Sequence, residues 1–124
     1  MLAAIERNLS DAGVAEISDE TRFDAAYKAV MQCALAAMMA SGYRPSTSEP
    51  GHHATLIQTL PLTLGIPTEA WIVLDALRRK RNSNDYTGDV VTGDMVAECS
   101  AQGRNLFFIL QRHLAQSHPQ LLRA

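Results

Sequence analysis

The pattern that most limits how this chain can fold is a regular spacing of apolar side chains between residues 18 and 42. Apolar residues recur there at steps of three and four, at Phe23, Tyr27, Val30, Ala34, Leu35 and Met38. This spacing places them on one face of a helix. Ser18, followed by Asp19 and Glu20, is typical of a helix N-cap, and Gly42 favours termination. The sequence therefore predicts an amphipathic helix of about six turns.

Two further helices are expected in the middle of the chain. The first should run from about His52 to Leu64, with Pro61 kinking it or ending it early and Gly65 terminating it. The second should begin near Pro67 and carry a wide apolar face. We expect it to weaken at residues 82–84, where Asn and Ser side chains compete for backbone hydrogen bonds.

The last long helix is expected to begin at Thr92 and to end between His113 and Ser117. Its buried stripe should hold Val96, Cys99, Gly103, Leu106, Leu110 and His113. A glycine on such a stripe costs helix stability and suggests close contact between helices. Residues 90–91 alone do not make a sheet. The sequence predicts an all-α, up-and-down bundle of four to five helices in one domain, 1–124, with residues 1–17 as a weak helix or arm.

Composition narrows the class of protein. At 124 residues, with 47% hydrophobic and 19% charged residues, the chain can bury a core and is not a disordered tail. The net charge of −2 argues against coating nucleic acid by bulk electrostatics. Cys33 and Cys99 are expected to be buried thiols, and no His/Cys spacing suggests a metal site. Without a signal peptide or a membrane-spanning apolar run, a soluble cytoplasmic protein that needs no cofactor is expected.

The candidate site is the basic segment Arg78-Arg79-Lys80-Arg81, which holds four of the eleven Lys and Arg residues. Any anion binding should be local to this segment, since the remainder of the chain is acidic. A structural explanation is also open. Cations are favoured at helix C-termini, and Asp85 could pair with one of these arginines.

Three stretches of the chain, taken in order, resemble HEPN domains. They are Phe23-Asp24-Ala25-Ala26-Tyr27-Lys28-Ala29, then Gly42-Tyr43-Arg44-Pro45 with Gly51-His52-His53-Ala54-Thr55, and finally Lys80-Arg81-Asn82 with Asp85-Tyr86. Together they span most of the chain from Phe23 to about Leu114. The resemblance implies a helical bundle that usually dimerises, often with RNase activity at the dimer cleft, and that is often encoded with a minimal nucleotidyltransferase.

Active members of the HEPN family carry an Arg followed, after four to six residues, by a His. Arg81 with Asn82 matches the first half of this motif, but Tyr86 stands where the shortest version has His. Cleavage at a 2′-hydroxyl needs a base and a cation. Arg81 suits the cation's role. Tyrosine, with a reference pKa near 10, is a poor substitute for imidazole.

Two functions follow from these residues and the resemblance. The favoured one is a module with degenerate catalysis that binds RNA, a nucleotide or a nucleotidyltransferase partner through Arg78–Tyr86. The alternative is a metal-independent RNase of a toxin–antitoxin system, in which Arg81 stabilises the phosphate, Asn82 orients it and Tyr86 or His53 supplies a proton. In both, Arg78, Arg79, Lys80 and Arg81 form the phosphate-binding surface, Asp85 supports it, and the protein is a homodimer. A structural dimer without a ligand is a third option.

Overall fold

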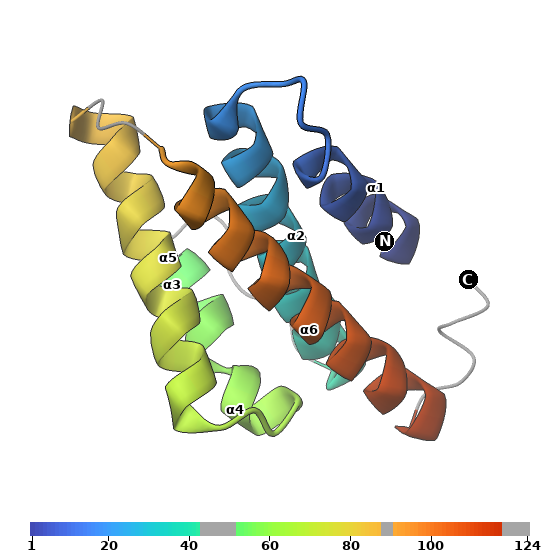
Figure 1. Ribbon diagram of the computed structural model, residues 1–124. Helices are drawn as coiled ribbons and strands as arrows, with labels where there is room; N and C mark the ends of the chain where they lie inside the picture. Colours follow the sequence, from blue (N-terminus) through green and yellow to red (C-terminus); the bar gives the residue numbers. More distant parts are fainter. Residues whose placement is uncertain (43–51, 88–90, 118–124) are drawn as a thin grey trace.

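The computed structural model describes residues 1–42, 52–87 and 91–117, and within these ranges it leaves aside the side chains of 52–54 and 83–87. The elements are helices throughout the described ranges (Figure 1). In chain order they are α1 (Leu2–Ala12), α2 (Asp19–Ala40), α3 (His52–Gln58), α4 (Leu60–Thr63), α5 (Thr68–Thr87) and α6 (Gly93–Ser117). This arrangement confirms the predicted all-α bundle.

Helix α2 is the centre of the bundle, because each of the other helices packs against it. The chain direction alternates along α1, α2, α5 and α6, and the short helices α3 and α4 lie between α2 and α5 in sequence (Figure 1). Helices α1 and α6 lie on one side of α2, whereas α3 and α5 lie on the other. Within the described ranges, no helix has the length and apolar character needed to cross a bilayer.

The two ends of α2 are formed as the sequence predicts. Ser18 has an extended backbone, and its Oγ accepts a hydrogen bond from the backbone N–H of Thr21 at 3.2 Å. Asp19 and Glu20 occupy the first turn. At the other end, Gly42 has φ +90°, a left-handed conformation that glycine adopts without steric cost. These residues confirm Ser18 as the N-cap and Gly42 as the stop.

Replacing the N-cap should destabilise the fold modestly. We expect Ser18→Ala to lower the free energy of unfolding by about 1 kcal/mol, because the N–H of Thr21 loses its acceptor. Urea denaturation followed by circular dichroism measures this change. Ser10→Ala is a matched control: Ser10 is exposed inside α1, so that variant should keep its stability or gain slightly. Equal loss in both variants would contradict the capping role.

The expected helix from His52 to Leu64 is divided in two, as Pro61 predicts. Helix α3 ends at Gln58, and α4 begins at Leu60 with Pro61 in its first turn. Proline has no backbone N–H to donate and clashes with the preceding turn, so it interrupts one helix but suits the start of the next. Gly65 follows with φ +68° and ends the segment.

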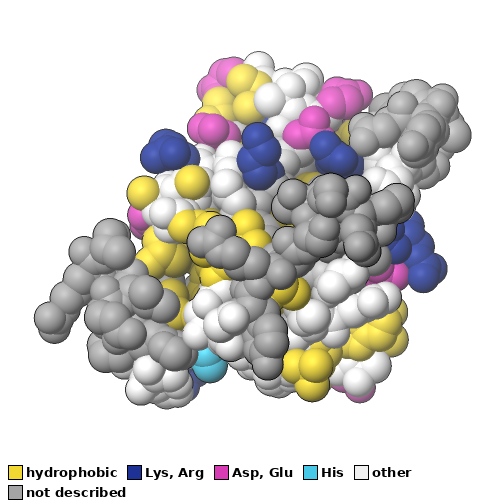
Figure 2. All heavy atoms as spheres, turned by 180° about the vertical axis from the view of Figure 1, so that it is seen from behind, with side chains coloured by type: hydrophobic (Ala, Val, Ile, Leu, Met, Phe, Trp, Pro, Cys, Tyr) yellow, Lys and Arg dark blue, Asp and Glu magenta, His cyan; other side chains and the backbone are white. Residues whose placement is uncertain are grey.

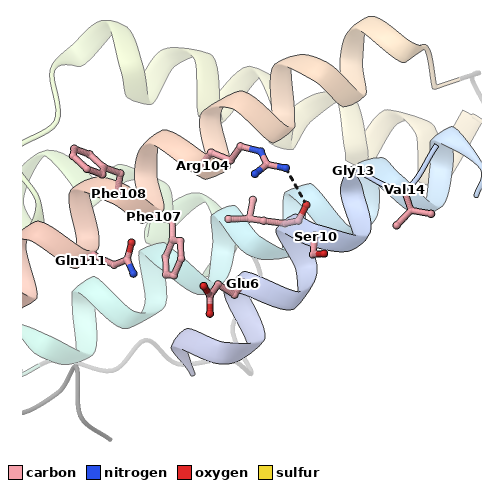
Figure 3. A pocket seen from close by; sticks show the side chains of 9 residues that line it. Glu6, Ser10, Gly13, Val14, Arg104, Phe107, Phe108 and Gln111 are labelled. Carbon is pink, nitrogen blue, oxygen red and sulfur yellow. Dashed lines mark hydrogen bonds between the residues drawn. The ribbon is translucent and has the colours of Figure 1, made fainter.

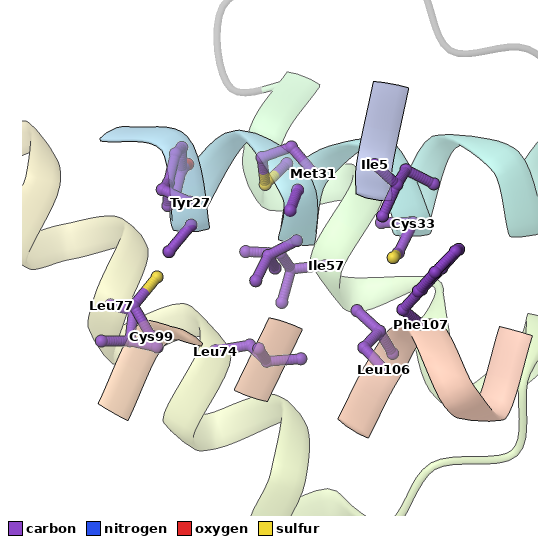
Figure 4. Packing of buried hydrophobic residues seen from close by; sticks show 14 of the residues in the cluster. Ile5, Tyr27, Met31, Cys33, Ile57, Leu74, Leu77, Cys99, Leu106 and Phe107 are labelled. Carbon is purple, nitrogen blue, oxygen red and sulfur yellow. The ribbon is translucent and has the colours of Figure 1, made fainter. Parts of the chain in front are cut away.

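The hydrophobic core brings together residues from α1, α2, α3, α5 and α6 (Figure 4). Cys33 and Cys99 lie in this core as free thiols, as predicted, and burial raises the pKa of each to about 12. Gly103 is also buried on α6. A Cβ added there would lie 3.0 Å from Leu9 Cδ2 and 3.6 Å from Val30 Cγ2. This confirms the close helix contact predicted at Gly103.

The first residues form a packed helix rather than a frayed arm. Ile5, Leu9 and Ala12 of α1 are buried against the rest of the bundle. Two arginines bind carbonyl oxygens at the C-terminal end of α1: Arg22 Nε donates to Ala12 at 2.9 Å, and an Arg104 Nη donates to Leu9 at 3.5 Å. Cations in this position stabilise the last carbonyls of a helix, which carry no intrahelical partner.

The expectation that the third long helix weakens at residues 82–84 is wrong. Helix α5 continues through this segment to Thr87. Local competition by Asn and Ser side chains is a weak effect, which does not by itself end a helix. Here Arg81, one residue before the polar segment, is fixed to α2 by Asp24 and Tyr27. The basic segment therefore lies within α5 and not at its C-terminus.

Candidate functional site

The positive charge of the basic segment of α5 is partly compensated by acidic side chains, and Asp75 makes the first of these contacts. One turn before the cations, its carboxylate accepts from Arg78 Nε at 2.9 Å and lies 3.1 Å from an Arg79 Nη. The side chain of Asp75 is 9% exposed and that of Arg78 is 18% exposed, whereas that of Arg79 is 74% exposed. Asp75 is therefore a buried anion that orders two neighbouring arginines.

Arg81 joins α5 to α2. Its Nε lies 3.3 Å from the Asp24 carboxylate, and its guanidinium carbon lies 5.0 Å from the ring centroid of Tyr27. The second distance is within the range of a cation–π contact, which strengthens when the pair is desolvated. The Arg81 side chain is 30% exposed. It thus lies at the edge of the interface between the two helices, half in contact with solvent.

Tyr27 is the buried member of the cluster that Arg81 forms with Asp24 and Tyr27. Its ring is almost fully buried, and burial raises the pKa of its phenol to about 12. The positive charges of Arg81 and Arg78 act in the opposite direction, because they favour the phenolate. Burial prevails, so Tyr27 is a neutral phenol across the physiological pH range.

The raised pKa of Tyr27 predicts a loss of stability in alkali. Because the folded-state pKa lies above the reference value of 10.0, this contribution is complete below pH 10 and is lost as the pH rises toward 12. Urea unfolding at pH 9, 10 and 11 should show this decline, and Tyr27→Phe should decline less steeply. Part of the slope should persist in the variant, since Cys33 and Cys99 shift in the same direction. Identical slopes would contradict the assignment.

Within the basic segment, Arg79 and Lys80 face solvent. Asn82, which follows the segment, is also exposed. Arg78, Arg79 and Arg81 pair with two carboxylates, those of Asp75 and Asp24. The four cations and these two acids together carry a charge of +2 rather than +4. Figure 2 shows the face opposite to that of Figure 1. Its Lys and Arg side chains lie in separate groups with acidic side chains among them. Among the described residues, α5 thus carries a small cationic surface.

The helical course of α5 affects the proposed RNase motif. Positions 81 and 86 are separated by five residues of helix, which places them about 140° apart around the axis and about 7.5 Å apart along it. The two positions therefore do not share one face of the helix. Asn82 is exposed. The side chains of Tyr86, Asp85 and His53 lie outside the described residues, so their predicted roles stay predictions.

The sequence interpretation missed the acids that hold the basic segment. Asp75 stands three and four residues before Arg78 and Arg79, the spacing at which helical side chains meet, and this signal was available. The pairing of Asp24 with Arg81 had no such signal, because the two residues are far apart in sequence. Tyr27 was interpreted as a packing residue. It is one, and it also contacts the Arg81 guanidinium.

Comparison with known proteins adds no relative to this picture. No protein-family model, no curated protein and no solved structure matches the chain. The resemblance to HEPN domains therefore rests on the sequence motifs alone. Among the described residues, no three His, Cys, Asp or Glu side chains gather as metal ligands would.

Proposed function

We propose that this chain is a HEPN-like helical module with degenerate catalysis that binds RNA through the exposed side of α5. The surface consists of Arg79 and Lys80, which are about 100° apart around the helix axis, and we call it the α5 surface. The observation that carries the proposal is the difference in solvent exposure among the four cations of the basic segment. Arg78 pairs with Asp75 in the same helix and is 18% exposed, and Arg81 pairs with Asp24 of α2. Arg79, in contrast, is 74% exposed, and Lys80 is also exposed.

The exposure of these side chains favours a phosphodiester backbone over a small nucleotide. Pockets for small ligands bury most of the ligand surface. Arg79 and Lys80 instead project from a convex helix, where they suit contacts to successive phosphates. Such contacts position a nucleic acid without reading its sequence. We propose RNA as the nucleic acid because HEPN domains, which the sequence resembles, often have RNase activity.

The arrangement around Arg81 supports binding more than catalysis. A catalytic arginine must present its fork to the reacting phosphate. Here the Nε edge of Arg81 faces Asp24 and the guanidinium plane lies near the Tyr27 ring. A proton donor at position 86 would also stand on a different side of α5. The homodimer and the nucleotidyltransferase partner implied by the resemblance stay predictions.

A salt titration with RNA tests the proposal. Fluorescence anisotropy of a labelled ten-nucleotide single-stranded RNA, in EDTA and at 50 to 200 mM salt, should show binding that weakens with salt. Two phosphate contacts predict a slope of about −1.4 in log K against log salt. No binding at 50 mM salt would contradict the proposal. The RNA should be recovered intact; cleavage that Arg81→Ala abolishes would favour the RNase instead.

A further inference from the structure

A groove between α1 and α6 lies on the side of the bundle away from α5, and the proposed function does not use it. The groove has a volume of about 550 Å³ (Figure 3). Helix α1 and its C-cap residue contribute four positions spaced as i, i+3, i+4 and i+7: Glu6, Leu9 and Ser10 from the helix and Gly13 from the cap. Positions with this spacing form one continuous face over two helical turns.

Helix α6 contributes a face with the same spacing. Its four lining positions are Arg104, Phe107, Phe108 and Gln111. The two helices run antiparallel here, so that Glu6 lies opposite Phe107 and Gln111, while Gly13 lies near Arg104 (Figure 3). Two such faces side by side form the seam into which a further helix packs in a helical bundle.

The walls of the groove are apolar in the middle and charged at the ends. Leu9 and Phe107 are buried and form its floor, whereas Phe108 is 58% exposed and Val14 is 37% exposed. An exposed aromatic residue next to a groove is a frequent anchor of protein interfaces. The small side chains at positions 10 and 13 allow a close approach to α1.

We propose that this groove binds one amphipathic α-helix of a partner protein. The match in spacing selects a helix, and the length of the two faces, about 10 Å from position 6 to 13, selects one that contacts the groove over about two turns. Its apolar face covers Phe107 and Phe108. The charges select a helix with a basic residue near one end, opposite Glu6, and an acidic residue near the other, opposite Arg104.

Two stapled helical peptides of about fourteen residues serve as probes, since shorter or unstapled helices are marginal in water. Both carry leucines at i, i+3, i+4 and i+7. The mixed peptide has Lys near one end and Glu near the other, and the acidic peptide has Glu at both ends. Anisotropy should show that the wild-type protein binds the mixed peptide more tightly. Phe108→Ser should weaken this binding about tenfold or more.

Two control variants, Leu62→Ser and Glu69→Lys, separate binding in the groove from non-specific hydrophobic association and from an effect of net charge. Leu62→Ser removes an apolar side chain that is 87% exposed on α4 and should leave the affinity unchanged. Glu6→Lys should reverse the preference toward the acidic peptide, because both ends of the groove are then positive. Glu69→Lys makes the same change of net charge on α5, where the residue is exposed, and should keep the preference of the wild type.

The proposal is overturned if Phe108→Ser and Leu62→Ser bind the mixed peptide equally, or if Glu6→Lys and Glu69→Lys behave alike. It is also overturned if the wild-type protein self-associates in analytical ultracentrifugation and Phe108→Ser abolishes that association. The groove would then belong to a second copy of this chain rather than to a partner helix.

Discussion

Asp75→Ala should lower the free energy of unfolding by about 3 kcal/mol, measured by urea denaturation at neutral pH. The substitution removes the carboxylate that pairs with Arg78. The Arg78 side chain is 18% exposed, so a largely buried cation is left near Tyr27 without that partner. Removing one partner of a buried ion pair costs more than the pair contributes, because the remaining charge keeps its desolvation penalty.

Two further variants show whether burial of charge is the cause. Asp24→Ala removes a carboxylate that is 60% exposed, and we expect it to cost less than about 1 kcal/mol. The double variant Asp75→Leu with Arg78→Met replaces the buried pair by apolar side chains. It should recover most of the stability that Asp75→Ala loses. If Asp24→Ala proved as costly as Asp75→Ala, or if the double variant recovered nothing, the account of this pair would be wrong.

Replacing both exposed cations of the α5 surface should remove most RNA binding. Each phosphate contact to a single strand contributes about eightfold at 50 mM salt, so Arg79→Gln with Lys80→Gln should weaken binding by roughly fiftyfold. The stability of this double variant should change little, because Arg79 is largely exposed and Asp75 keeps its bond to Arg78. Anisotropy titrations at several salt concentrations measure the affinity, and urea denaturation checks the fold.

The matched control removes two exposed cations elsewhere. Arg7 on α1 and Arg112 on α6 are exposed and lie on other helices than α5. Arg7→Gln with Arg112→Gln makes the same change of net charge, so it should weaken RNA binding far less than the α5 pair does. Equal losses in the two double variants would mean that RNA responds to net charge alone, and the α5 surface would not be a site.

The helical course of the chain was largely predictable from local patterns. The spacing from Phe23 to Met38, the Ser18 cap and the breaking effect of Pro61 depend on neighbours within four residues. The continuation of α5 through 82–84 was not predictable in this way. The pairing of Arg81 with Asp24 across the bundle was also not predictable, because no local pattern encodes it.

The basic segment could be identified from the sequence as a candidate site, but its electrostatics could not be predicted. Four adjacent cations suggested an open anion site, and the spacing alone could not show that Asp24 and Tyr27 lie beside Arg81. The burial of Asp75 likewise follows only from the packing of α5 on the core. The contacts to Asp75 and Asp24 hold Arg78 and Arg81 in place. Arg79 and Lys80 stay at the surface.

Mapping of RNA contacts by nuclear magnetic resonance tests the central claim most directly. A ¹⁵N-labelled protein, titrated with the ten-nucleotide RNA at 50 mM salt, should show chemical-shift changes concentrated at the backbone amides of Arg79 and Lys80 and at the Arg79 Nε. Amides of α1 should stay unchanged. Changes concentrated on another helix, or no changes at all, would contradict the assignment of RNA binding to the α5 surface.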